Sequence, residues 1–137
     1  MDGQAAARGS RLAGQAGIAR GLNHPLVQVL ATAQTRGSPH IGGHADLISF
    51  DATVAAAQRA YQQAGITAKD IDLVELHDCF SIAEVIDSED LGLVPRGQGG
   101  FWAYEGRTAV DGDVAINASG GLLAKGHPVG ATGLGQV

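Results

Sequence analysis

The sequence has few aromatic residues, a single cysteine and fewer basic than acidic side chains, and each shortage limits what the protein can be. Phe, Trp and Tyr make up 4% of the 137 residues, so the core must be built mainly from small aliphatic side chains, as in many α/β proteins. One cysteine cannot form an internal disulfide, which fits a reducing compartment. The net charge of −5 and isoelectric point near 5.3 argue against a nucleic-acid-binding surface, because such surfaces are usually basic.

Segments that direct a protein to a membrane or an organelle are also missing from the sequence. No apolar run approaches the roughly 20 residues of a membrane-spanning helix. The N-terminus has no apolar core of a signal peptide, and the C-terminus has no targeting tripeptide. We therefore expect a cytoplasmic protein without a membrane span; in a eukaryote the expected compartment would be the peroxisome, although the tripeptide is absent.

The length allows one domain, 1–137, with one hydrophobic core. Residues 1–10 are small and polar, without periodicity, and we expect them to be disordered. Hydrophobic periodicity and turn residues predict the remaining elements. Helices are expected over Arg11–Leu22, from Asp51 to Gly65, from Ser81 to Leu91 and from Val129; strands over Leu26–Gln34, Ile71–Leu76 and Asp113–Asn117; a single turn at Thr67–Asp70; and loops at Arg36–Ile48 and Pro95–Gly112.

Side-chain chemistry adds expectations about helix ends and packing. Asp51 is a suitable N-cap and Gly65 a suitable stop, while Ser81 and Glu84 have the spacing of a capping box. Apolar spacing predicts a buried stripe on the helix from Ser81. The residues expected inside are Ile82, Val85 and Ile86 of that stripe, Leu122 and Leu123 after the paired glycines, and the loop aromatics Phe101, Trp102 and Tyr104.

The most informative stretch is Asn117–Gly133, which reads NASGGLLAKGHPVGATG and directly follows a short apolar run. Gly120 and Gly121 allow positive φ angles and a close approach of the backbone to whatever lies opposite. The proline after His127 restricts that histidine to an extended conformation. The stretch therefore predicts a stiff turn that presents an imidazole to a ligand.

A second polar motif ends the predicted strand Ile71–Leu76, where the chain reads His-Asp-Cys-Phe from position 77. Two strand ends thus each deliver a histidine, and one also delivers the only cysteine. If the strands are neighbours in one sheet, His77, Cys79 and His127 lie together at one edge. A thiol beside two imidazoles suits acid–base catalysis at neutral pH. Zinc binding and a buried structural cysteine remain alternatives, although three isolated ligands are a weak metal signal and we expect no metal.

Together, the His-Asp-Cys-Phe, Asn-Ala-Ser-Gly-Gly and Gly-His-Pro motifs resemble the C-terminal half of the thiolase superfamily. The resemblance is greatest to the branch of sterol-carrier-protein thiolases and lipid-transfer proteins, and it extends from about Asp51 to Val137. It implies an α/β fold with helices packed on a mixed β-sheet, here truncated before the last strands. Such a fragment would cover about a third of an intact enzyme and would be poorly stable alone.

The resemblance also implies roles for individual residues. His127 is similar to the histidine that activates the nucleophilic cysteine, and His77 to a residue that completes an oxyanion hole. Cys79 is similar to the second acid/base, which moves a proton at the α-carbon of an acyl group. The nucleophile lies in the N-terminal half of such enzymes and has no counterpart here, and a later Cys-x-Gly loop would lie beyond Val137. The residues expected to line the substrate site are Asn117, Ser119, Gly120, Gly121 and Gly126, the first two mainly by shaping the loop.

The implied reaction is a Claisen condensation, or the reverse thiolytic cleavage of a 3-oxoacyl-CoA. Coenzyme A thioesters would be substrates, with no covalently bound cofactor. The expected partners are acyl-CoA, the missing N-terminal half and, in the complete enzyme, further copies of the protein. The chain alone is expected to be inactive. Two other interpretations stay open: a non-catalytic lipid-transfer or scaffold subunit, and a retro-aldolase relative. Relatives that resemble retro-aldolases have tyrosines at the two positions that are histidines here, which favours the thiolase reaction.

Overall fold

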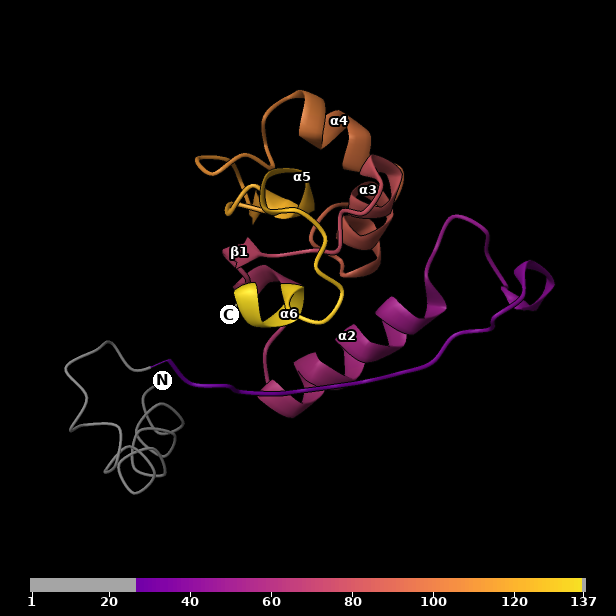
Figure 1. The fold of residues 1–137 in the computed structure, drawn as a ribbon. Coiled ribbons are helices and arrows are strands. Elements are labelled where there is room, and N and C mark those ends of the chain that lie inside the picture. The colour runs from indigo at the N-terminus through magenta and orange to yellow at the C-terminus, as the bar shows by residue number, and fades with distance from the viewer. Residues whose placement is uncertain (1–26, 137) are drawn as a thin grey trace, which may run out of the picture. The chain divides into compact units, whose positions relative to one another are not determined.

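The computed structural model describes residues 27–136 (Figure 1). The chain divides into two units after Leu30, and all the elements below belong to the second unit, Ala31–Val137. The predicted helix Arg11–Leu22 and the predicted disorder of residues 1–10 lie outside the described residues. The helices and strands are η1 (Ile41–Gly43), α2 (Asp51–Ala64), η2 (Ala68–Asp70), β1 (Leu73–Val74), α3 (Ser81–Asp90), α4 (Gly99–Tyr104), β2 (Ala115–Ile116), α5 (Gly121–Lys125) and α6 (Thr132–Gly135).

The predicted α/β class is confirmed, and the sheet of the described residues consists of β1 and β2 in parallel. Leu73 pairs with Ala115, and Val74 pairs with Ile116. Both predicted strands are therefore neighbours, but each keeps only two residues of its expected length. The connection between them carries α3 and α4, as a parallel pair requires.

The strand expected over Leu26–Gln34 is wrong for its described part, because residues 27–34 have no regular secondary structure. Val27 and Val29 are 86% and 70% exposed, so the alternation of apolar residues does not correspond to a buried face. A β-rich sequence without a pairing partner leaves its backbone groups outside any ladder. The loop expected at Arg36–Ile48 is confirmed except for the single turn η1.

Helix α2 ends as predicted, at Gly65, whose φ of 69° is left-handed and whose N–H donates to Tyr61 O at 2.8 Å. Its start differs from the expectation, because Phe50 is the N-cap and Asp51 makes no capping hydrogen bond. Asp90 of α3 instead accepts the Phe50 N–H at 2.6 Å and the Ser49 hydroxyl at 2.8 Å. Hydrogen bonds that a residue of another helix accepts therefore fix where α2 begins.

Helix α3 contacts both α2 and α4, but its buried face is not the predicted one. Ile82 is 60% exposed, and Val85 and Ile86 are only half-buried. The buried residues of α3 are Ala83, Asp87 and Ser88. The reason is polar pairing, since Asp87 accepts the Thr53 hydroxyl of α2 at 2.9 Å. The capping box predicted at Ser81 is also absent, and the turn at Thr67–Asp70 carries one instead.

The segment expected as a loop at Pro95–Gly112 contains α4, whose start is held by Glu89 of α3. The Glu89 carboxylate accepts the backbone N–H groups of Gly97 and Gly99, both at 2.8 Å. The aromatic residues of this segment do not all fold back on the core, because Phe101 is 63% and Tyr104 91% exposed.

Trp102 is the aromatic residue of α4 with a defined partner. The Arg107 guanidinium lies 3.5 Å from the centre of the Trp102 ring, and its Nε also donates to Asp113 Oδ2 at 2.8 Å. Arg107 therefore connects α4 with the segment that enters β2. Separately, no helix of residues 27–136 has the length and apolarity needed to cross a membrane.

Candidate active site

The two histidine-bearing loops leave the same edge of the sheet, where β1 and β2 end. The Asn117 N–H donates to Val74 O at 2.8 Å, so the strand pairing continues to the first residue of the second loop. Because the strands are parallel, residues 75–79 and 117–122 start side by side. The sheet thus brings together two segments that are distant in the sequence.

Asn117 has the conformation and hydrogen bonds of a structural junction. Its φ of 51° makes it the non-glycine residue with positive φ in the described part of the chain, and asparagine tolerates this region better than most residues. The Asn117 side-chain Oδ1 accepts the Leu76 N–H at 2.7 Å, while Nδ2 donates to Glu84 Oε2 of α3 at 2.8 Å. One amide therefore joins β2, the first loop and a helix.

Glu75 forms a second cross-link between the loops. Its Oε1 accepts the Ser119 N–H at 2.9 Å and its Oε2 the Ser119 hydroxyl at 2.5 Å, while Lys125 Nζ lies 3.5 Å from Oε2. Burial acts to raise the pKa of Glu75, whose side chain is only 12% exposed, but the hydrogen bonds from Ser119 and the charge of Lys125 lower it overall. Glu75 is thus held as a carboxylate, and Lys125 is paired with it.

Asp78 forms the third cross-link and explains the paired glycines. Its Oδ1 accepts the Leu122 N–H at 2.8 Å, which caps α5, a helix that the sequence analysis did not anticipate. A side chain on Gly121 would overlap the Asp78 carboxylate, and one on Gly120 would meet Ala124 Cβ at 2.6 Å. The positive φ expected at both glycines is confirmed, at 91° for Gly120 and 59° for Gly121.

The structure brings His77 and His127 into contact. Their ring centres lie 4.8 Å apart, and the rings meet edge to face at 83°. Both residues are exposed, so the imidazole pair is open to a ligand or a partner. The loop of His77 is also tied to the end of α6, because Gln136 Nε2 donates to Leu76 O at 3.4 Å.

The other predicted site residues occupy the same two loops. Cys79 follows His77 in the first loop and is an exposed free thiol, so the alternative of a buried structural cysteine is wrong. Gly126 is exposed, with φ 78° and open space around it, directly before His127. Leu122 is buried as expected, but Leu123 is 95% exposed because α5 turns it outward. Within residues 27–136, no three His, Cys, Asp or Glu side chains are placed to hold a metal ion.

Sequence reasoning missed the carboxylates that hold the site together, Glu75, Asp78 and Glu84. Glu75 and Asp78 lie beside His77, Glu84 lies in the first turn of α3, and each accepts a hydrogen bond from the opposite loop. Acidic residues clustered at a strand end were a usable signal, because buried polar groups in such loops need partners. Their partners were not identifiable, since they come from residues far along the chain.

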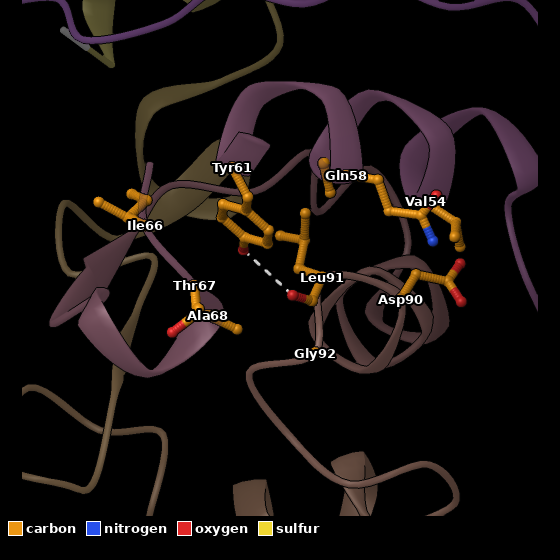
Figure 2. Close-up of a pocket in the computed structure, with 10 residues that line it drawn as sticks. Val54, Gln58, Tyr61, Ile66, Thr67, Ala68, Asp90, Leu91 and Gly92 are labelled. Atoms are coloured by element: carbon orange, nitrogen blue, oxygen red, sulfur yellow. Dashed lines mark hydrogen bonds between the residues drawn. The ribbon is translucent and has the colours of Figure 1, made fainter. Parts of the chain in front are cut away.

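A cavity of about 390 Å³ lies elsewhere, between α2, η2 and the end of α3 (Figure 2). Tyr61 stands within it and donates its hydroxyl to Leu91 O at 3.0 Å; burial raises the pKa of Tyr61. The carboxylate of Asp90 lies at one end, already bonded to Ser49 and Phe50. None of the residues that line this cavity comes from the two histidine loops, so it is separate from the candidate active site.

Fold and site together define an α/β domain that presents two imidazoles and a thiol where two parallel strands end. The chain belongs to the thiolase C-terminal domain-like family, which matches residues 33–137. The acetyl-CoA acetyltransferase of Methanothermobacter thermautotrophicus is 48% identical over 121 residues, covering 88% of this chain and 32% of that protein. Sterol carrier protein 2 of Homo sapiens is 42% identical over 139 residues, covering 98% of this chain and 25% of that protein.

Among solved structures, the Ltp2-ChsH2(DUF35) aldolase is similar, with a TM-score of 0.69 and 26% sequence identity. The match covers 77% of this chain and 28% of that chain. The chain therefore spans about a third or less of the proteins it resembles. The predicted membership of the thiolase superfamily, in the branch related to sterol carrier protein 2, is confirmed.

Proposed function

We propose that this chain is the C-terminal part of a thiolase-like acyl-CoA C-acyltransferase. The observation that carries the proposal is the contact of the His77 and His127 rings at the ends of β1 and β2, with the exposed Cys79 in the same loop. The name of the acetyl-CoA acetyltransferase relative points to the same chemistry. The nucleophile would come from a second, N-terminal half, so the chain by itself would be inactive.

Each reactive group would serve one part of the reaction. His127 would take the proton of the nucleophilic thiol, whose sulfur attacks the thioester carbonyl and releases coenzyme A. Cys79 would then remove a proton from the α-carbon of a second acyl-CoA, and the resulting carbanion would attack the acyl group and expel the nucleophile. His77 would donate a hydrogen bond to the oxygen on which negative charge develops, which is usually the largest catalytic contribution.

Backbone rather than charged side chains would contact the substrate at the glycine turn. Gly120, Gly121 and Gly126 would allow a thioester to approach His127 closely. Asn117 and Ser119 would shape the substrate site through the loop, because their polar atoms are bound to protein groups. Lys125 would not be a primary phosphate ligand, since it pairs with Glu75.

The partners of the chain follow from this assignment. They would be acyl-CoA, the nucleophile-bearing half and, in the complete enzyme, further copies of the protein. Coenzyme A would act as a substrate carrier without a bound cofactor. The acyl group could include a lipid or sterol side chain, as the name of the sterol carrier protein 2 relatives suggests. The compartment we propose is the cytoplasm, or the peroxisome in a eukaryote.

A second candidate function is retro-aldol cleavage within an assembly that includes a DUF35 protein. The structural similarity to the Ltp2-ChsH2(DUF35) aldolase favours it. Against it, residues 77 and 127 are both histidines in this chain, which favours the thiolase reaction. A lipid-binding or scaffold subunit, the remaining alternative, would need neither histidine and would tolerate loss of both.

The test supplies the chain with a nucleophile-bearing thiolase half and follows the two half-reactions separately. Acyl-enzyme is trapped from labelled acetyl-CoA, and condensation to acetoacetyl-CoA is measured independently. Cys79→Ala should retain acyl-enzyme formation but lose condensation by about 10²–10⁴-fold, the usual worth of acid–base assistance. His127→Ala should damage both half-reactions, because one imidazole serves the nucleophile and the carbonyl.

Other results would assign a different function. Condensation by Cys79→Ala at the wild-type rate would make Cys79 dispensable and place the second acid/base beyond Val137. Cleavage of an aldol substrate, with no acyl-enzyme, would favour the aldolase. If the double variant His77→Ala/His127→Ala binds lipid as tightly as the wild type, and neither protein catalyses condensation or aldol cleavage, the lipid-binding subunit would be favoured.

A further inference from the structure

The loop that carries His77 is held by two linked hydrogen bonds that begin at Glu84 in α3. Glu84 Oε2 accepts from Asn117 Nδ2 at 2.8 Å, and Asn117 Oδ1 accepts from the Leu76 N–H at 2.7 Å. Leu76 is buried and directly precedes His77. Glu84 thus lies two hydrogen bonds away from the residue that sets the start of the histidine loop.

The orientation of the Asn117 amide within these hydrogen bonds depends on Glu84. An amide has one donor end and one acceptor end, so Asn117 can accept from Leu76 only if its NH₂ group faces Glu84. A carboxylate is an obligatory acceptor and so selects this orientation. With the amide reversed, its NH₂ group would face the Leu76 N–H, leaving two donors opposed near a buried backbone group.

Asn117 and Glu84 are each held in place by a different part of the fold. On one side, Asn117 belongs to the segment that pairs with β1 through Val74 O, so its position is set by the sheet. On the other side, α3 begins directly after Cys79 and Phe80, so its first turn is set by the same loop that carries His77. Glu84 therefore connects both ends of the His77–Cys79 segment to the strand that leads to His127.

We propose that Glu84 is a positioning residue: by orienting the Asn117 amide, it holds the His77 loop in the place where the His77 ring meets that of His127. The proposal deepens the acyltransferase assignment and rests on it for its kinetic consequence. Glu84 itself touches neither ring and is not a catalytic residue. Misplacement of a catalytic group by about 1 Å can cost about 10²-fold in rate, which sets the scale of the expected effect.

Reciprocal substitutions test the orientation of the amide. Asn117→Asp keeps the acceptor for Leu76 and tolerates the positive φ, but it places two carboxylates face to face. Glu84→Gln offers a neutral acceptor and should change little. The double variant Glu84→Gln/Asn117→Asp reverses the pair, because the amide introduced on α3 then donates to the new carboxylate on the loop.

Glu89→Ala is the matched control. Glu89 lies on the same helix, is half-buried and accepts two backbone hydrogen bonds, but its partners Gly97 and Gly99 belong to α4 and the turn before it. It should lower stability without moving the histidines. Glu84→Ala, its counterpart, removes the acceptor at the site.

Two measurements are made on every variant. The first is the proton–proton NOE between the His77 and His127 rings in the histidine-labelled 137-residue chain, whose five histidines are assigned by single substitutions. The second is kcat and KM for condensation, together with the nucleophile-bearing half, at a temperature well below each melting point. The NOE reports position whether or not the acyltransferase assignment holds, so failure of that assignment is seen separately as an inactive wild type.

For Asn117→Asp and Glu84→Ala we expect the NOE to be lost and kcat to fall about 30- to 100-fold, with KM changed less than about threefold. Glu84→Gln and the double variant should keep the NOE and at least about a third of the wild-type kcat. Glu89→Ala should keep both while its melting point falls. A retained NOE in Asn117→Asp, a double variant no better than Asn117→Asp, or an equal loss of kcat in Glu89→Ala would each overturn the proposal.

Discussion

The carboxylate of Asp78 lies where a side chain on Gly121 would have to be. It also accepts the Leu122 N–H at 2.8 Å, so it cannot move aside without uncapping α5. Gly121→Ala should therefore reduce the free energy of unfolding by about 3 kcal/mol, the sum of a left-handed backbone cost and overpacking. Urea denaturation followed by circular dichroism measures this loss.

Gly126→Ala is the control for that prediction. Gly126 has the same sign of φ, at 78°, but nothing lies within 4 Å of the added Cβ. Its ψ of 177° places it in a region that is almost restricted to glycine, so the cost should be about 1–3 kcal/mol of backbone strain without overpacking. A loss in Gly121→Ala no larger than about 1–2 kcal/mol, the cost of a left-handed backbone alone, would show that Asp78 yields to the new methyl group.

Glu75 should make stability depend on pH in the acidic range. Its folded pKa lies below its ordinary value of 4.5, so its stabilising contribution is complete above pH 4.5 and is lost as the pH falls through the folded pKa. Glu75→Gln should cost about 1–2 kcal/mol at neutral pH, and the difference from wild type should shrink as the pH falls below that ordinary value. Denaturant titrations of both proteins from neutral to acidic pH test this, and a difference independent of pH would contradict it.

Asp87 should behave in the opposite way. Burial raises its pKa above the ordinary 3.8; the Thr53 hydroxyl and His77 oppose the rise, and Asp90 adds to it. The folded state therefore binds a proton that the unfolded state has lost, and stability falls as the pH rises from 3.8 through the folded pKa. Asp87→Asn should stabilise the protein by about 1 kcal/mol at neutral pH and by nothing in strong acid, because its amide oxygen still accepts from Thr53.

Asp90→Asn provides the contrast on the same helix. Asp90 uses both oxygens to accept hydrogen bonds, from Ser49 and from the Phe50 N–H, and an amide can replace only one of them. This variant should lose about 1–2 kcal/mol at neutral pH. A gain in stability here like that of Asp87→Asn would show that relief of charge, rather than burial of Asp87, is the cause.

Arg107→Lys should be destabilising although the positive charge is retained. The guanidinium stacks on Trp102 while Nε and Nη2 both donate to Asp113 Oδ2, at 2.8 and 2.5 Å. An ammonium group cannot reproduce the flat stacking and the paired donors, so we expect a loss of about 1 kcal/mol. Trp102 is the single tryptophan, and its fluorescence should shift in Arg107→Lys but not in Asp113→Asn, which leaves the stack in place.

Most features that the sequence predicted correctly depend on residues close to one another in the chain, and one depends on strand topology. Gly65 stops α2 because glycine alone adopts its left-handed conformation without cost, and Gly120 and Gly121 have positive φ for the same reason. The two strand ends and their polar loops were recognisable from apolar runs followed by motif residues. The pairing of β1 with β2, and hence the contact of His77 with His127, followed from parallel topology.

The features that were missed depend on hydrogen bonds between distant segments. Helix α4 begins where Glu89 accepts two N–H groups, and α5 begins where Asp78 caps Leu122. Neither helix has a local cap or a long apolar period to reveal it. The buried face of α3 was mispredicted because Asp87 finds a partner on α2, so a charged residue replaces Ile82 on the inside.

The parallel pairing of β1 and β2 also has a consequence for the order of folding. A short turn cannot connect two parallel strands, so the segment that carries α3 and α4 must form the connection before β2 can pair with β1. Closing such a connection costs entropy before the sheet contacts repay it, and contacts of this kind form slowly. During synthesis the loop of His77 leaves the ribosome first and has no partner until β2 and the glycine turn have followed. Its cysteine is then exposed to solvent, and we expect the histidine pair to be among the last contacts to form.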